Sequence, residues 1–166
     1  MKDRYVVTYL EMAETFAKLS HAKRLKVGAV FVSTEGVMST GVNGMPSGGS
    51  NECENKVYME SGAGGWIDPE DILAHWPYMD AEKKRYNLVT KSECSHAEEN
   101  LFAKMMRQGV STIGGTIFVT TSPCIHCAKI IVGSGVVAVY YRSKYRDDAG
   151  INWLLRNGVT VVQVTP

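Results

Sequence analysis

Apolar side chains recur at helical spacing near the N-terminus, at Tyr5, Tyr9, Met12, Phe16 and Leu19. This spacing predicts a first helix over residues 5–19. Asp3 is suited to be its N-cap, because a carboxylate can accept a hydrogen bond from the first free backbone amides. Two apolar runs follow, KVGAVFVS and GVMSTGVN, with the turn-like TEG between them. They predict the two strands of a β-hairpin.

The second half of the chain alternates between helix and strand patterns. The expected elements are a helix at 96–108, a strand at 115–121, a helix at 123–133, a strand at 136–141, a helix at 151–157 and a strand at 159–165. Gly109 and Gly158 directly follow two of these helices, where glycine commonly ends a helix. A helix, a hairpin and then alternating strands and helices predict an α/β fold, a three-layer α/β/α sandwich around a five-stranded mixed sheet.

The stretch from residue 44 to residue 92 has no sustained periodicity, and we expect it to be irregular. It opens on the glycine-rich NGMPSGGSN, and DPEDILAHW within it favours a short helix that starts at Asp68-Pro69. Connections of this length inside a compact domain are usually functional. We therefore expect one domain over residues 1–166, in which 44–92 is an insertion that offers an allosteric or subunit surface.

Composition narrows the setting. The chain has 166 residues, of which 45% are hydrophobic, but no apolar run approaches the roughly 18 residues of a membrane span. The net charge is +1 with dispersed basic residues, which argues against a nucleic-acid polymer as partner. The start MKDRYVVTYLEMAETF lacks the pattern of a signal peptide, and four cysteines are too few for a disulfide scaffold. We expect a soluble cytoplasmic protein with reduced thiols.

Cys124 and Cys127 follow Pro123 in the segment TSPCIHC, directly after a predicted strand. Pro123 suits the first turn of a helix, so the two cysteines, three positions apart, share one face of that turn. The partial positive charge of a helix N-terminus lowers a thiol pKa and favours the thiolate, the form that binds metals. On its own the pair fits a redox dithiol, half of a structural zinc site or half of a catalytic zinc site.

A structural zinc site needs four protein ligands, and the other cysteines, Cys53 and Cys94, form no second CxxC pair. His96, in the segment SHAEEN, is a third candidate ligand and leaves one coordination position open. Glu98 follows two residues later, where it can take a proton from a water and give it to a leaving group. H-x-E with P-C-x-x-C is the signature of zinc nucleobase deaminases, and this match favours an active site. Glu99 is interpreted as an acidic residue of the helix start.

At this point the chain resembles the deoxycytidylate (dCMP) deaminases of the cytidine deaminase superfamily. The resemblance lies in KVGAVFVS, TGVNGMPSGGSN, HAEEN, TIFVTTSPCIHCAKIIVGSGV and SKYRD. The zinc signature alone would also fit nucleoside, tRNA-adenosine, guanine or riboflavin-pathway deaminases, and GVNGMPSGG is the segment that points to dCMP. The resemblance implies zinc-dependent hydrolytic deamination of dCMP to dUMP and ammonia, which supplies dUMP for thymidylate synthesis.

The resemblance also assigns roles to residues. It implies one catalytic Zn²⁺ per chain on His96, Cys124 and Cys127, with Glu98 as the proton shuttle. The substrate contacts that it implies are Asn43 at the sugar and Arg24 at the 5′-phosphate, with Ala97, Ser122 and Pro123 around the nucleotide. Tyr145 follows a strand end near the same face, and two interpretations stay open: it closes over the nucleotide, or it is a rim tyrosine that packs against the sheet. Independently of family, the planar fork of an arginine suits a phosphate. Many microbial members use a cysteine where this chain has Ala22 to hold a second, structural zinc, so a second zinc is not predicted.

Regulation is implied in the same way. The resemblance implies a homohexamer that dCTP activates and dTTP inhibits, each as its Mg²⁺ complex. The candidate effector contacts are Gly44, Gly48, Gly49 and Asn51 of the glycine-rich loop. Backbone amides that glycines leave exposed can bind phosphates, which makes this loop a reasonable candidate.

Two other classes remain open. A tRNA-adenosine or polynucleotide cytidine deaminase would share the zinc chemistry, but it needs a positive surface for the phosphate backbone, and the net charge of +1 argues against one. A non-enzymatic module stabilised by zinc would explain the cysteines. It would not explain Glu98 beside an open coordination position.

Overall fold

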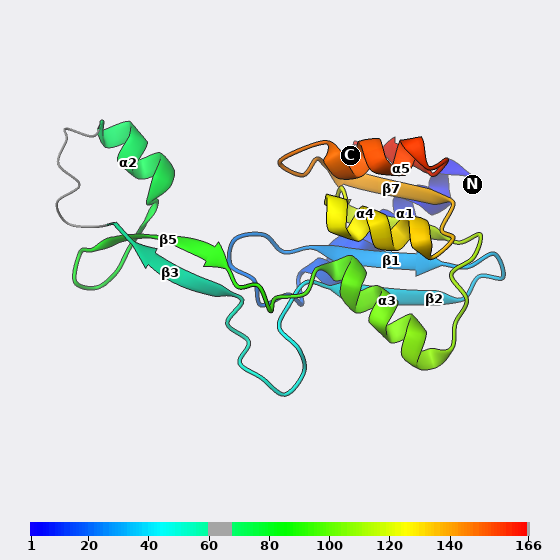
Figure 1. The fold of residues 1–166 in the computed structure, drawn as a ribbon, viewed down its shortest axis with the longest axis horizontal. Helices are drawn as coiled ribbons and strands as arrows, with labels where there is room; N and C mark the ends of the chain where they lie inside the picture. Colours follow the sequence, from blue (N-terminus) through cyan, green and yellow to red (C-terminus); the bar gives the residue numbers. More distant parts are fainter. Residues whose placement is uncertain (60–67, 166) are drawn as a thin grey trace.

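A computed structural model of the chain describes residues 1–59 and 68–165 (Figure 1). Its centre is a five-stranded sheet in the order β2-β1-β6-β7-β8. The strands are β1 (Gly28–Val32), β2 (Met38–Val42), β6 (Thr116–Thr121), β7 (Ala138–Ser143) and β8 (Thr160–Gln163). β1 is antiparallel to β2 and β6, whereas β6, β7 and β8 are parallel. The predicted mixed sheet is confirmed.

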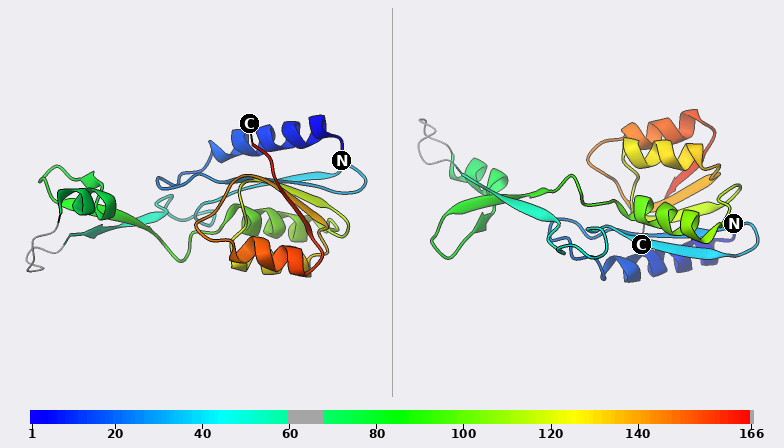
Figure 2. Two further views of the ribbon diagram at one scale, coloured as in Figure 1. Left: turned by 90° about the horizontal axis from the view of Figure 1, so that it is seen from above. Right: turned by 60° about the horizontal axis from the view of Figure 1, so that its bottom comes forward.

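Helices cover both faces of this sheet (Figure 2). They are α1 (Asp3–Ala17), α3 (Ala97–Gln108), α4 (Ile125–Gly133) and α5 (Ala149–Arg156). Apolar residues of α1 pack with Val30, Val32 and Phe118 on one face. The other three helices contribute to a larger core with Phe31 and Ile117. The predicted three-layer α/β/α sandwich is therefore confirmed.

The helix ends differ from the sequence prediction in detail. Lys2, not Asp3, is the N-cap of α1, and Asp3 is the first helical residue, where its negative charge still favours the helix N-terminus. The helix ends at Ala17 rather than at residue 19. Gly109 adopts the left-handed conformation after α3 (φ 64°), as a glycine stop predicts.

Close backbone contacts fix two helices at the positions where the site is built. A Cβ on Gly41 of β2 would collide with the carbonyl oxygen of Ala97, so the first turn of α3 lies directly on the sheet. A Cβ on Gly150 of α5 would collide with the carbonyl of Pro123. Glycine at both positions is needed because a helix start approaches the backbone more closely than any side chain allows.

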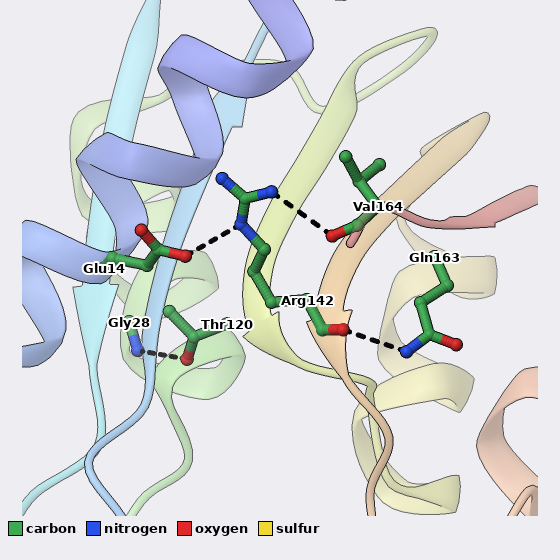
Figure 3. Close-up of polar contacts among 6 residues, drawn as sticks. All are labelled: Glu14, Gly28, Thr120, Arg142, Gln163 and Val164. Atoms are coloured by element: carbon green, nitrogen blue, oxygen red, sulfur yellow. Dashed lines mark hydrogen bonds and ion pairs between the residues drawn. The ribbon is translucent and has the colours of Figure 1, made fainter. Parts of the chain in front are cut away.

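Arg142 of β7 ties the N-terminal helix to the C-terminal strand (Figure 3). Its Nε donates to Glu14 Oε1 of α1 at 2.8 Å, and its Nη1 donates to the carbonyl of Val164 at 3.3 Å. Gln163 Nε2 donates back to the Arg142 carbonyl at 3.0 Å. The Arg142 side chain is 11% exposed and that of Glu14 44% exposed, so the arginine is largely buried while its partner faces solvent, and the contacts link β7 to α1.

A second, three-stranded antiparallel sheet lies in the stretch expected to be irregular, so that expectation for 44–92 was wrong. Its elements are β3 (Glu54–Tyr58), α2 (Pro69–His75), β4 (Tyr78–Met79) and β5 (Arg85–Thr90). The described part of 54–90, here called the arm, extends away from the three layers (Figures 1 and 2). Asp68 caps α2 by accepting the Glu70 N–H at 2.9 Å, as predicted. Residues 60–67 of the predicted insertion lie outside the described residues.

None of the helices in the described ranges combines the length and the apolar character needed to cross a membrane.

Candidate metal centre and active site

His96 is the N-cap of α3, immediately after a β-bridge between Gly44 and Ser95. The Glu99 carboxylate accepts the His96 backbone N–H at 2.7 Å. This contact fixes the backbone of His96 and leaves its imidazole to project from the helix start. Glu99 therefore belongs to the helix start, as interpreted from the sequence.

Cys124 is the N-cap of α4, and Cys127 lies in its first turn. Pro123 precedes the cap, so its predicted place inside the first turn was wrong by two positions. The sulfurs nevertheless lie on one side of the helix start, because the Ala128 N–H donates to the Cys124 carbonyl at 2.9 Å and closes the first turn around them. His126, between the two cysteines, is exposed.

The three candidate ligands converge. His96 Nδ1 lies 3.5 Å from Cys124 Sγ and 3.4 Å from Cys127 Sγ. Tetrahedral zinc with usual bond lengths separates a nitrogen and a sulfur ligand by about 3.6 Å. Among residues 1–59 and 68–165, these three form the one group of at least three His, Cys, Asp or Glu ligand atoms close enough to share a metal.

Cys53 and Cys94 do not join this group. They are buried in a separate small cluster with Ala22, against which Met45 packs. All four cysteines are free thiols. The geometry therefore favours a site with three protein ligands over a four-ligand structural zinc site.

Hydrogen bonds among the three ligand side chains shift the pKa of each of them. The hydrogen bond with Cys127 is the main cause that lowers the pKa of the Cys124 thiol to about 3. The same bond, with burial, raises the pKa of Cys127 well above its ordinary range. A hydrogen bond with Cys124 raises the pKa of His96 to about 9. Because metal binding requires deprotonated ligands, a metal entering this site displaces protons from Cys127 and His96.

Glu98 is almost fully buried, with 4% of its surface exposed. Burial is the largest cause that raises the pKa of its carboxyl to about 7. A carboxyl that titrates near neutrality can both accept and return a proton at physiological pH. Its backbone lies in the first turn of α3, two residues after His96, so its place relative to the ligands is set by the helix.

A cavity of about 320 Å³ opens beside these residues. Eight of the residues singled out from the sequence line it: Arg24, Asn43, His96, Ala97, Glu98, Ser122, Cys124 and Tyr145. Cys127 and Pro123 are not in its lining. Cys127 is fully buried and contacts His96, which does line the cavity, and Pro123 is buried against Gly150.

Asn43 is more constrained than a free sugar ligand. Its Oδ1 accepts the Val27 N–H at 2.8 Å, and its Nδ2 donates to the Leu25 carbonyl at 2.8 Å. A carboxamide has two N–H donors, so one remains available towards the cavity. The side chain thus organises the segment before β1 in addition to lining the cavity.

Tyr145 is held in place by Ser122. The Tyr145 backbone N–H donates to Ser122 Oγ at 2.8 Å, and Ser122 is itself buried. Arg146 stacks its guanidinium 5.2 Å from the centre of the Tyr145 ring. Lys144 and Arg146 also line the cavity, so the cations of the SKYRD segment lie beside it, on the same wall as Tyr145.

Sequence reasoning missed part of the wall. Glu54 and Thr90 line the cavity from the base of the arm, and Cys94 does so from the segment before His96. Glu54 and Thr90 face each other across the β3–β5 ladder. No local pattern marks them, because their place depends on a strand pairing that the sequence did not reveal.

The glycine-rich loop lies outside the cavity lining. The Gly44 N–H donates to the Ser95 carbonyl at 3.0 Å, so this amide is already occupied. Gly48 has a φ of +92° and open space around its Cα. Gly49 donates its N–H to the Pro46 carbonyl at 3.4 Å, and the Asn51 carbonyl accepts from the Cys53 thiol at 3.6 Å.

Residues 4–143 match the model of the cytidine and deoxycytidylate deaminase zinc-binding region, and the chain belongs to this family. The resemblance drawn from the sequence motifs is thereby confirmed. The deoxycytidylate deaminase of Enterobacteria phage T2 is 34% identical over 176 positions, which cover 95% of this chain and 90% of the phage protein. That of Saccharomyces cerevisiae is 32% identical over 156 positions, 93% of this chain and 43% of the yeast protein.

Solved structures agree. The chain is similar to the dCMP deaminase of cyanophage S-TIM5, solved in complex with dCMP and dUMP, with a TM-score of 0.76 and 33% identity over 99% of each chain. A bifunctional deaminase/reductase from Thermotoga maritima shares the fold at a TM-score of 0.60 and 19% identity, over 95% of this chain and 36% of that one. The His96, Cys124 and Cys127 group thus lies in a zinc-binding deaminase domain.

Proposed function

We propose that this protein is a dCMP deaminase, which hydrolyses the exocyclic C4–N bond of dCMP to give dUMP and ammonia. One observation carries the proposal: a three-ligand group and a buried carboxyl, Glu98, meet in a cavity whose wall also carries Arg24, Lys144 and Arg146. The ligand group and the carboxyl of Glu98 suit the hydrolysis of an amidine, and the three basic side chains suit the binding of a phosphate. The names of the similar phage and yeast proteins support the same substrate.

The donor set fits zinc. Two thiols and an imidazole are ligands that zinc prefers, and the distances of 3.4 and 3.5 Å between nitrogen and sulfur suit its tetrahedral geometry. We propose His96, Cys124 and Cys127 as the ligands of one zinc per chain. When bound, zinc supplies a water whose pKa lies near neutrality.

Glu98 is proposed to move the protons of the reaction. Its carboxylate accepts one proton from the attacking water and gives it to the ring nitrogen N3. It then takes the second proton from the hydroxyl newly attached to C4 and gives it to the amine, which leaves as ammonia while C4 becomes a carbonyl. Burial keeps its pKa close to 7, so neither direction of transfer is strongly uphill. The backbone of the α3 start holds it beside the cavity without help from a mobile loop.

Residues in the outer wall of the cavity are proposed to bind and orient the nucleotide. The remaining N–H of the Asn43 carboxamide is proposed to donate to the deoxyribose, and Tyr145 to cover the nucleotide. Arg24, with Lys144 and Arg146, is proposed to bind the 5′-phosphate. Ala97, Ser122 and Pro123 are proposed to shape the base pocket, Ser122 through Tyr145 and Pro123 through the backbone at the start of α4.

One assay separates this function from its alternatives. Release of ammonia by the zinc-loaded protein is measured on dCMP, deoxycytidine, cytidine, cytosine and adenosine. The proposal predicts dCMP as the preferred substrate. Preference for adenosine, or for an unphosphorylated base or nucleoside, would contradict it, and so would a protein that binds zinc but releases no ammonia.

Regulation and assembly are part of the proposal. We propose a homohexamer activated by dCTP and inhibited by dTTP, each with Mg²⁺, through the loop from Gly44 to Asn51. The arm is proposed as a subunit surface within the single domain over 1–166. Its exposed apolar residues support this: Val57, Tyr58, Leu73, Tyr78, Met79 and Val89. A small sheet without a core of its own gains stability only by packing against something else.

The setting follows from the chemistry. Thiol ligands bind zinc only in the reduced form, and all four cysteines are free. We therefore propose a cytoplasmic enzyme whose product, dUMP, supplies thymidylate synthesis.

A further inference from the structure

The segment that carries Arg24, residues 18–27 between α1 and β1, has no helix or strand of its own. Side-chain hydrogen bonds with Asn43 hold its two ends. Ser20 Oγ donates to the Asn43 carbonyl at 2.8 Å. At the other end the Asn43 carboxamide binds the backbone of Leu25 and Val27. These contacts hold the two ends of the segment, and between them Ala22 is buried beside Cys53 and Cys94.

The backbone amides of Lys23 and Arg24 are both bound by one carboxylate. Glu54 Oε1 accepts the backbone N–H of Lys23 at 2.8 Å and that of Arg24 at 3.1 Å. Glu54 comes from the first residue of β3, at the base of the arm. Hydrogen bonds to a charged acceptor are stronger than those between neutral groups, so this carboxylate directly constrains the Arg24 backbone.

The guanidinium of Arg24 is contacted by a residue of β5, the strand that pairs with β3. Arg24 Nη1 donates to Thr90 Oγ1 at 3.4 Å. Thr90 is the cross-strand partner of Glu54 in the β3–β5 ladder. This one cross-strand pair therefore contacts Arg24 twice: Glu54 binds its backbone, and Thr90 binds its guanidinium. All three residues line the cavity beside the metal ligands.

The guanidinium stays available for an anion. Glu54 contacts the backbone and not the side chain of Arg24, and within the described residues no ion pair to Arg24 is found. A guanidinium has five N–H donors, and the contact with Thr90 uses one. The remaining donors can bind a phosphate at the mouth of the cavity.

We infer that Glu54 is a positioning residue, which selects nucleotide over nucleoside substrates by holding Arg24 for the 5′-phosphate. The inference rests on the proposed function, because it takes Arg24 as the phosphate ligand. An exposed arginine loses much side-chain freedom when it binds. The contacts of Glu54 with the Arg24 backbone and of Thr90 with its guanidinium reduce that loss of freedom. The resulting gain in affinity applies only to substrates that carry a phosphate.

The negative charge of Glu54 by itself weakens the binding of a phosphate, whereas its hydrogen bonds to the backbone strengthen it. A carboxylate in the cavity wall repels a phosphate dianion, and only its hydrogen bonds to the Lys23 and Arg24 amides favour binding. Glutamine keeps an acceptor oxygen and removes the charge. Glu54→Gln therefore separates positioning from electrostatics, which Glu54→Ala does not.

The test compares Glu54→Ala and Glu54→Gln with a matched control, Glu52→Ala. Glu52 is an exposed carboxylate two residues away, whose only ion pair among the described residues is with Lys91 at 3.9 Å. Steady-state rates on dCMP and deoxycytidine are measured with the zinc-loaded full chain. Calorimetric titration with dUMP and deoxyuridine gives the same comparison where nucleoside turnover is too slow to follow.

We expect Glu54→Ala to raise KM for dCMP, and Kd for dUMP, by about tenfold with kcat retained, because the lost hydrogen bonds act on the phosphate only through the position of Arg24. Values for deoxycytidine and deoxyuridine should change by less than about twofold. Glu54→Gln should restore the nucleotide values to those of the unaltered chain or below, and Glu52→Ala should change neither. Equal losses on nucleotide and nucleoside would make Glu54 a merely structural residue and overturn the inference.

A double-variant cycle tests the route through Arg24. In an Arg24→Ala background, Glu54→Ala should cost no further affinity for dUMP, because the group that it positions is gone. Additive losses would overturn the inference. Failure of the proposed function is distinct from both results, because the zinc-loaded unaltered chain would then release no ammonia from dCMP.

Discussion

The imidazole Nδ1 of His96 lies 3.4 Å from the sulfur of Cys127, although the two residues are 31 positions apart. Two helix starts, those of α3 and α4, bring them together. α3 packs on β2 at Gly41, and α4 follows β6. Because β2, β1 and β6 are consecutive strands of one sheet, the packing of the helices on the sheet fixes the positions of the three ligands. A metal bound here needs little rearrangement of the chain.

Zinc content tests the ligand group. Purified protein is expected to hold one zinc per chain, as measured by elemental analysis, and a chelator that removes it should abolish activity. Cys124→Ala together with Cys127→Ala removes two of three ligands and should leave the protein without zinc. Cys53→Ala, in the separate cysteine cluster, is the control and should keep it. Zinc retained in the double variant would contradict the assignment.

The raised pKa of Glu98 predicts how stability depends on pH. Its pKa in the folded chain is about 7, against an ordinary 4.5. Between these values the folded state holds a proton that the unfolded state has lost, so stability falls as pH rises through this window. The loss reaches about 3 kcal/mol for the metal-free chain near pH 7.

Glu98→Gln cannot ionise and should escape this loss. We expect the metal-free variant to unfold at a higher temperature than the metal-free unaltered chain near pH 7, with the difference vanishing near pH 4.5. Thermal unfolding followed by circular dichroism at both pH values measures it. A difference that does not depend on pH would show that Glu98 is not held protonated by burial.

Arg24→Ala tests the phosphate contact. The variant should lose about 10- to 100-fold in kcat/KM on dCMP, while deoxycytidine, which has no phosphate, should be affected little. Arg24→Lys should recover only part of the loss, because a lysine cannot bind two oxygens through a planar fork. Parallel losses on both substrates would dismiss Arg24 as the phosphate ligand.

Regulation is tested on the loop that follows β2. With Mg²⁺ present, dCTP should tighten and dTTP should weaken the apparent affinity for dCMP, with a coupling of about 1–3 kcal/mol and a sigmoidal rate curve. Gly48 has φ +92°, so valine there would strain the backbone, and Gly49→Val is the cleaner change. It should flatten the response while zinc stays bound, and Gly133→Ala, at the end of α4 with open space around it, should not. A hyperbolic curve that neither nucleotide shifts would contradict the claim.

The parts of the site that the sequence predicted are those with short-range signals. His96 and Glu98 lie two positions apart at a helix start, and Cys124 and Cys127 three apart at another, so local spacing sufficed. The central sheet followed from apolar runs, since its inner strands β1 and β6 are almost entirely buried.

The arm left no such signal. Of the residues in β3 and β5 only Leu88 is buried, and strands without a buried face show no apolar alternation. Glu54 and Thr90 were therefore missed, because their contacts with Arg24 depend on a strand pairing that joins residues 36 positions apart. The double hydrogen bonding of Asn43 was missed for a different reason: the hairpin was predicted, but the residue pattern does not show which backbone groups before β1 a side chain will bind.

The most direct test of the account is the turnover of dCMP by zinc-loaded Glu98→Gln beside the zinc-loaded unaltered chain, with zinc content and dUMP affinity measured on the same samples. Glutamine preserves the shape of the side chain but cannot relay a proton. The account predicts that zinc and dUMP remain bound while kcat falls by at least about 100-fold. A folded, zinc-loaded variant that releases ammonia from dCMP at close to the original rate would contradict it.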